Sequence, residues 1–193
     1  MRRLFRFITA QVDIARSTIR IGVLKLLYPG LKIIGSTIAS GCKIICVKGS
    51  VIVIENSFIE RGTKIIADHG GEVYIRNSYI GDNCVIVARE LIRIEQGTKI
   101  AEMVVIRDQD HQINDLSQFN TAPIFIGANV WIGAKVTILK GSDIGDGCVV
   151  GAHSIVKNKL DGDAVYVGAP ARKIKVITRG DISHIGANNS KHI

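Results

Sequence analysis

Aromatic side chains are scarce in this chain: Phe, Trp and Tyr make up 5% of its 193 residues, with a single tryptophan. The four cysteines form no C-x-x-C pair, and Cys42, Cys84 and Cys148 occupy small inward positions of a sequence repeat described below. We therefore expect reduced core thiols of a cytoplasmic protein. No run of about 18 uncharged apolar residues is present. Asp13, Arg16 and Arg20 interrupt the apolar segment that follows the first arginines. We therefore expect a protein that is neither secreted nor membrane-spanning.

Acidic residues are in the minority, and the formal net charge is +8. Such a charge fits nucleic acid, an anionic membrane surface or a small anionic ligand. The sequence contains no helix-turn-helix, zinc finger or aromatic RNA-binding strand. We therefore expect no nucleic-acid partner.

A six-residue repeat is the main positive feature of the chain. From residue 126 to residue 156 an aliphatic residue falls at every sixth position, and the fifth residue of each complete hexad is small or β-branched. This period fits neither an amphipathic helix, which repeats at about 3.6, nor a half-buried strand, which repeats at about 2. It is typical of a coil of short parallel strands in which three hexads complete one turn. The aliphatic positions are Ile126, Ile132, Ile138, Ile144, Val150 and Val156, and the fifth positions are Val130, Val136, Ser142, Cys148 and Ser154.

A looser form of the repeat begins at Leu31. Ile38, Ile59 and Ile80 open similar segments 21 residues apart, whereas three hexads make about 18 residues. We therefore expect extra residues at corners of the coil, near 48–49 and 69–71. The pattern stops after Ile106 and resumes near residue 124, while residues 107–123 are mostly polar and have no periodicity. This segment is predicted to protrude from the coil, and protruding loops often carry function.

Composition divides the chain into three parts: a basic amphipathic helical segment over residues 1–30, a β-helix domain over residues 31–176 and a tail over residues 177–193. In the first part, apolar residues follow helical spacing among several arginines. This helix is predicted to cap the open end of the coil, as terminal units of repeat proteins do, or to lie on an anionic membrane through residues 1–28. One helix can do both.

Four motifs of the chain are similar to those of a known family. They are PIFIGANVWIG at 123–133, IGDG at 144–147, GAHSIV at 151–156 and GAPAR at 168–172. They resemble the hexapeptide-repeat acyltransferases, above all the galactoside, maltose and polysaccharide O-acetyltransferases. The resemblance implies an all-β fold that is a left-handed parallel β-helix, acetyl-coenzyme A as co-substrate, and a homotrimer with active sites between subunits. It does not extend to residues 1–30, so the acceptor is left open.

His111 is the predicted general base. It is the only one of five histidines in the protruding loop: His184 and His192 are in the tail, His69 is at an expected corner and His153 is within a hexad. The resemblance matches it to the family's catalytic histidine, which follows the same break in the repeats. A histidine suits this task because its pKa lies near working pH.

Four further residues are predicted to contact the substrate. Asp108 and Asp110 closely precede the histidine, and each either orients the imidazole, binds acceptor hydroxyls or is an ordinary polar residue of the loop. Asn83 is predicted at a corner of the coil, with an acceptor contact and a structural role both open. Trp131 fills the family's Asn-Val-Trp-Ile-Gly pattern and is expected to form a wall of the acceptor side.

The cofactor positions follow from the resemblance alone. Small residues at corners let the extended pantetheine arm approach the backbone, and basic residues near the end of the coil match family contacts to the phosphates. The predicted pantetheine contacts are Gly133, Ala134, Gly151 and Ala152, and the predicted polar contacts are Lys157, Arg172 and Lys175.

The sequence therefore predicts an O-acetyltransferase that acts on a sugar hydroxyl, of a bacterial surface polysaccharide (capsule or lipopolysaccharide) or its precursor, by direct attack on the thioester. The enzyme is expected in the cytoplasm or at the inner face of the plasma membrane. N-acetylation of an amino sugar and a non-catalytic scaffold are the alternatives. No metal is expected, because γ-type carbonic anhydrases of the same coil use a His-x₄-His pair and position 116 here is Leu.

Overall fold

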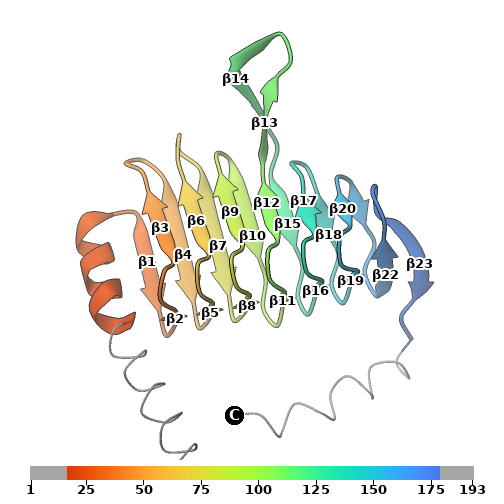
Figure 1. Cartoon of the computed structure of the whole chain (residues 1–193), viewed down its shortest axis with the longest axis horizontal. Helices are drawn as coiled ribbons and strands as arrows, with labels where there is room; N and C mark the ends of the chain where they lie inside the picture. The colour runs from red at the N-terminus through yellow and green to blue at the C-terminus, as the bar shows by residue number, and fades with distance from the viewer. Residues whose placement is uncertain (1–16, 179–193) are drawn as a thin grey trace, which may run out of the picture.

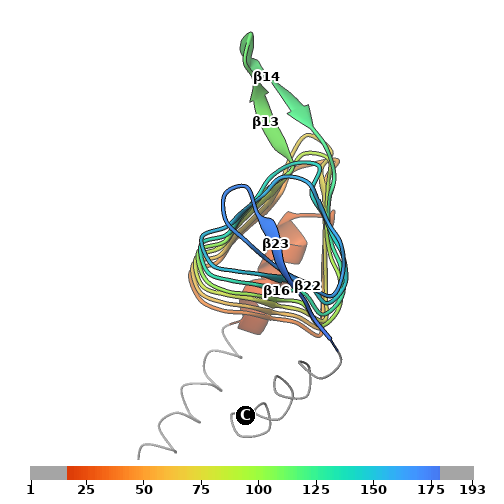
Figure 2. The same cartoon turned by 90° about the vertical axis from the view of Figure 1, so that its right-hand side faces the viewer.

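The computed structural model describes residues 17–178, which form a parallel β-helix preceded by one short helix. Figure 1 shows the successive turns of the coil stacked side by side, with a single hairpin standing out from them. Viewed along its axis in Figure 2, the coil has a roughly triangular outline. The prediction of an all-β parallel helix with a short N-terminal helix and one protruding loop is confirmed.

Three parallel sheets make the faces of the coil. Sheet 1 contains β1 (Leu31–Ile34), β4 (Val51–Glu55), β7 (Glu72–Arg76), β10 (Leu91–Ile94), β15 (Ile124–Ile126), β18 (Asp143–Ile144) and β21 (Lys159–Leu160). Sheet 2 contains β2 (Thr37–Ile38), β5 (Phe58–Ile59), β8 (Tyr79–Ile80), β11 (Lys99–Ile100), β16 (Trp131–Ile132), β19 (Val149–Val150), β22 (Ala164–Val167) and the antiparallel β23 (Arg172–Val176). Sheet 3 contains β3 (Lys43–Cys46), β6 (Lys64–Ala67), β9 (Val85–Ala88), β12 (Val105–Arg107), β17 (Thr137–Ile138) and β20 (Ile155–Val156).

The hexad positions form the core, as the spacing predicts. Each of the six aliphatic positions from Ile126 to Val156 is at most 1% exposed, and the fifth positions are buried as well. Identical positions of successive turns are paired in register, for example Ile38 with Ile59 and Ile59 with Ile80. The extra residues of the early turns lie at the corners between sheets 3 and 1, where turns occur at 48–49 and 69–70.

A helix over residues 17–27 packs on the open N-terminal end of the coil. Ile21, Leu24 and Tyr28 contact the core, and the Ser17 hydroxyl accepts a hydrogen bond from the Ile38 N–H at 3.0 Å. Arg20 donates to the carbonyl oxygens of Ile38 and Ala39. These contacts satisfy backbone groups that the first turn would otherwise expose. Residues 1–16 and 179–193, which hold most of the predicted N-terminal segment and tail, lie outside the described residues.

The protruding segment is a two-stranded antiparallel hairpin. It consists of β13 (Gln109–Gln112) and β14 (Asp115–Thr121), inserted between the end of β12 in sheet 3 and the start of β15 in sheet 1. His111 pairs with Phe119 across it, and the register shifts just after His111. Figure 2 shows the hairpin leaving the coil at one corner. Within residues 17–178, no helix has the length and apolar character needed to cross a bilayer.

Candidate active site on the protruding hairpin

Asp108 anchors the base of the hairpin to the body of the coil. Its side chain is fully buried, and its carboxylate accepts hydrogen bonds from the backbone N–H of Arg89 at 2.9 and 3.1 Å and of Glu90 at 2.8 Å. Burial raises the pKa of Asp108, although the backbone N–H groups act in the opposite direction. The Asp108 carboxylate therefore points into the coil, toward Arg89 and Glu90. This orientation does not support its predicted contact with the imidazole or with the acceptor.

His111 lies near the middle of the hairpin with its side chain exposed. Its Nδ1 is 2.6 Å from the carbonyl oxygen of Leu116. A carbonyl oxygen can only accept, so this contact requires a proton on Nδ1. In the neutral imidazole the other nitrogen, Nε2, is then the unprotonated one. The exposed His111 side chain therefore carries a ring nitrogen that can accept a proton.

Phe119 and Arg89 support the His111 ring, and neither is among the residues singled out from the sequence. The rings of His111 and Phe119 have centroids 4.2 Å apart. The Arg89 guanidinium carbon lies 3.6 Å from the centroid of the Phe119 ring, and Arg89 Nε donates to Asp68 Oδ1 at 3.0 Å. One signal was available for Phe119, which is the only Phe, Tyr or Trp in the polar segment 107–123. Arg89 carries no comparable signal.

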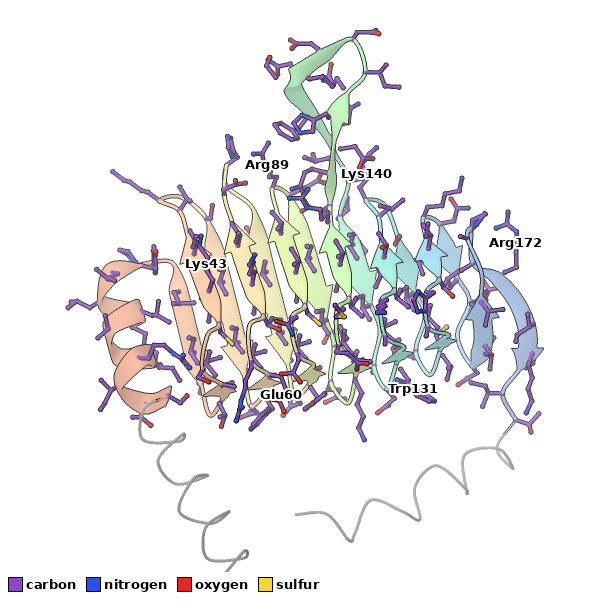
Figure 3. The ribbon with its side chains drawn as sticks, viewed as in Figure 1. Lys43, Glu60, Arg89, Trp131, Lys140 and Arg172 are labelled. Atoms are coloured by element: carbon purple, nitrogen blue, oxygen red, sulfur yellow. The ribbon has the colours of Figure 1, made fainter. Side chains whose placement is uncertain are left out.

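Asp110 is also on the hairpin but faces outward. Its side chain is 53% exposed, and its Oδ2 lies 3.9 Å from Nζ of Lys140, which belongs to the next corner between sheets 3 and 1. Figure 3 shows Arg89 and Lys140 near the base of the hairpin. Asp110 and His111 are therefore available to a molecule that approaches this corner.

Trp131 lies on a different face from the hairpin. It opens β16 in sheet 2, is 54% exposed and lines a cavity of about 770 Å³. Figure 3 shows its side chain on the side of the coil opposite the hairpin. Other residues that line this cavity include Lys99, Asn129, Asp146, Asp163 and Ile177. One chain therefore does not bring Trp131 and His111 together.

Asn83 occupies a corner between sheets 2 and 3. Its φ is +55°, and its side-chain oxygen lies over Gly62 of the preceding turn, where an added Cβ would collide with it. Asparagine tolerates this left-handed backbone better than most residues. The contacts of Asn83 are those of a corner residue that packs turn on turn, and the structure does not bring it to His111.

The predicted pantetheine positions are stacked on one corner of the coil. Gly133 and Ala134 follow β16, and Gly151 and Ala152 follow β19, so both pairs lie between sheets 2 and 3. A Cβ on Gly133 would approach the Ala152 nitrogen to 2.6 Å, so the close stacking requires glycine at position 133. Small side chains therefore line this edge over two consecutive turns.

The predicted basic contacts are spread over the C-terminal end. Arg172 and Lys175 lie on β23, and Lys157 follows β20, where sheet 3 leads back to sheet 1. All three side chains are exposed. Between residues 17 and 178, no group of three or more His, Cys, Asp or Glu side chains could hold a metal ion.

Comparison with known proteins agrees with the motifs. The family model of the bacterial transferase hexapeptide (six repeats) matches residues 123–158. The chain is 34% identical over 103 residues to WbbJ of Escherichia coli, which is named as a lipopolysaccharide biosynthesis O-acetyl transferase; the match covers 47% of this chain and 53% of WbbJ. It is 41% identical over 71 residues to the galactoside O-acetyltransferase of Escherichia coli, covering 37% of this chain and 35% of that enzyme.

The matched part spans only about a third to a half of each of these two relatives. Among solved structures, a point mutant of AntD, an N-acyltransferase from Bacillus cereus crystallised with dTDP and coenzyme A, has a TM-score of 0.68 at 23% identity, covering 85% of this chain and 93% of that one. At this identity the likeness concerns the fold. The resemblance to hexapeptide-repeat acyltransferases is confirmed by these comparisons.

Proposed function

We propose that this chain, a hexapeptide-repeat β-helix of the acyltransferase type, is an acetyl-coenzyme A-dependent O-acetyltransferase acting on a sugar hydroxyl. The acceptor class that we propose is a bacterial surface polysaccharide, capsule or lipopolysaccharide, or its precursor. The observation that carries the proposal is the hydrogen bond between His111 Nδ1 and the Leu116 carbonyl, since it leaves Nε2 as an exposed base on the hairpin. Relatives named as O-acetyltransferases support the choice of reaction.

In the proposed reaction, His111 Nε2 removes the proton from the acceptor hydroxyl as its oxygen attacks the thioester carbonyl carbon. The C–S bond then breaks, and the His111 imidazolium returns the proton to the departing sulfur, which leaves as coenzyme A thiol. A base of this kind contributes about 10²–10⁴-fold to the rate. Transfer is direct, because burial raises the pKa of all four cysteine thiols and so disfavours an acyl-cysteine intermediate.

For the acyl donor we propose the edge formed by Gly133, Ala134, Gly151 and Ala152, with Lys157, Arg172 and Lys175 for its phosphates. The stacked small residues fit an extended thioester arm, because no side chain keeps such an arm away from the backbone. Exposed cations at the C-terminal end fit phosphates.

We further propose that the active site forms between copies of the chain in a homotrimer. His111 and Trp131 lie on different sides of one coil, so a site that uses both requires a second copy to bring its sheet 2 near the hairpin. In this arrangement Asp110 and Trp131 contact the acceptor, while Asp108 holds the hairpin in place.

The test is the His111→Ala variant, which is expected to lose at least about 100-fold in acetyl transfer while still binding coenzyme A by calorimetry. Ile113→Ala is the matched control, because Ile113 lies on the same hairpin with its side chain 95% exposed. Full activity in His111→Ala would refute the assignment. Assays with hydroxyl and amino sugars then separate O- from N-acetylation, since the same base serves an amine. Absence of coenzyme A binding would favour a scaffold instead.

Peripheral membrane contact through the N-terminal segment is a separate part of the proposal. The helix over residues 17–27 leaves Ile19, Val23, Leu26 and Leu27 exposed on the side away from the core, with Lys25 among them. Apolar side chains beside cations are typical of helices that lie in an anionic bilayer surface. Replacing Leu26, 85% exposed, and Leu27 together by Glu is expected to reduce sedimentation with anionic vesicles. Unchanged sedimentation would leave this helix only its capping role.

A further inference from the structure

Arg89 contacts the body of the coil at one point and the hairpin at two. Its Nε donates to the Asp68 carboxylate of the preceding turn at 3.0 Å, and its backbone N–H donates to Asp108 at the hairpin base at 2.9 Å. Its guanidinium lies over the Phe119 ring on the returning strand at 3.6 Å. The side chain is only 17% exposed. Because Asp68 holds one edge of the guanidinium, the position of its flat face over Phe119 is set by the coil itself.

The Phe119 ring, which lies against the fixed guanidinium, also packs against the His111 imidazole. It pairs with His111 across the hairpin, and the two rings are tilted by 41° with centroids 4.2 Å apart. Phe119 therefore contacts the guanidinium and the imidazole together. A two-stranded hairpin is only marginally stable by itself in water, and among residues 17–178 the exposed His111 ring makes one hydrogen bond. The orientation of the ring therefore depends on packing against Phe119.

We infer that Arg89 is a positioning residue which, through Phe119, holds the His111 imidazole so that Nδ1 stays on the Leu116 carbonyl and Nε2 faces the acceptor. The inference rests on the proposed function only in so far as it concerns rate. Arginine suits this place better than lysine, because its planar guanidinium can stack on a ring while its edge binds a carboxylate. Without it, the imidazole is free to turn over and present the wrong nitrogen.

The kinetic test compares Arg89→Met, Phe119→Leu and the double variant. Each single change is expected to lower kcat about tenfold, which is about 1.4 kcal/mol, with the KM values for both substrates unchanged. The double variant is expected to be no slower than either single one, because the two residues act through one contact. Phe119→Tyr, which keeps an aromatic ring, is expected to restore most of kcat. Arg93→Met is the matched control, since Arg93 lies over the Tyr74 ring on sheet 1 and beside Glu95.

A spectroscopic test that does not depend on activity shows whether Arg89 orients the His111 imidazole or only holds the hairpin against the coil. The ¹⁵N resonances of the His111 ring in the full-length protein distinguish a proton on Nδ1 from a proton on Nε2. The wild type and Arg93→Met are expected to show the Nδ1–H form, and Arg89→Met a mixture of both forms. If Arg89→Met fails to fold, Arg89→Lys is measured in its place. It is also expected to show a mixture of both forms, with a smaller share of the Nε2–H form.

Two results would overturn the inference: a wild-type nitrogen spectrum in the Arg89 variant, or losses in kcat that multiply to about 100-fold in the double variant. If the wild type transfers no acetyl group to any acceptor, the proposed function fails, but the nitrogen spectra still decide whether Arg89 positions the ring.

Discussion

Replacing Asp108 by alanine tests whether the hairpin is held by a buried carboxylate. The change removes the acceptor of two buried backbone N–H groups, those of Arg89 and Glu90. A buried donor left without a partner costs about 1–3 kcal/mol. Part of this loss is offset, because the variant no longer buries a carboxylate whose pKa is raised by desolvation. We expect a net loss of about 3 kcal/mol in the free energy of unfolding.

Thermal denaturation followed by circular dichroism measures this loss. At about 2–4 °C per kcal/mol for a chain of this size, the Tm of Asp108→Ala is expected to fall by about 6–12 °C. Asp110→Ala is the matched control: its carboxylate is half exposed and 3.9 Å from Lys140. Such a pair is worth about 0–1 kcal/mol, so the control is expected to move Tm by less than about 4 °C. Equal Tm values for Asp108→Ala and the wild type would refute the reasoning.

The pH dependence of Tm for the wild type and Asp108→Ala gives a second check. The pKa of Asp108 in the folded protein lies above its ordinary value of 3.8, so between these two values the folded state binds more protons than the unfolded state. The contribution of this group to stability therefore rises as pH falls through the folded-state pKa. The Tm difference between wild type and Asp108→Ala is expected to widen from pH 7 toward pH 4. A difference that narrows would contradict the assigned direction.

Two further predictions concern the core. Thr63→Val is expected to lose about 2 kcal/mol, because the buried hydroxyl donates to the Gly81 carbonyl at 2.8 Å and accepts from the Cys84 N–H at 3.0 Å. Thermal denaturation measures this loss, and an unchanged Tm would contradict the stabilisation assigned to these two hydrogen bonds. Burial raises the pKa of Cys84 and Cys148 to about 11, so at pH 8 only about one such thiol in a thousand is ionised. Both thiols are therefore expected to resist a thiolate-reactive disulfide reagent in the native protein and to react once it is denatured; rapid reaction of the folded protein at these positions would contradict their burial.

The coil was predictable from the sequence because its cause is local and repeated. An aliphatic residue at every sixth position, such as Ile132 and Ile138, can be buried only if each hexad forms one face of a coil, and both are fully buried. The break after Ile106 likewise predicted a protrusion. The structure agrees, because the strand that starts at Ile124 pairs with the strand of the turn before the break. His111 was singled out as the histidine within the break, and the structure places it on the hairpin, while its role as a base stays a proposal.

The contacts around the site were not predictable, because they join residues that are distant in the sequence. Asp108 and Asp110 look equivalent on either side of Gln109, yet one is buried under Arg89 and Glu90 and the other faces Lys140. Hydrogen bonds from a corner 19 residues earlier decide which of them points inward.

The sequence by itself determined the period of the coil, its buried positions and the place of the hairpin, because these follow from where apolar residues recur. Only the tertiary structure decided that Arg89 lies over Phe119, that the Leu116 carbonyl accepts a hydrogen bond from His111 Nδ1 and that Trp131 lies on another face. The physical reason is that stacking turns brings together side chains from different turns, and the identity of those neighbours depends on the register and the corner lengths, which no single repeat contains.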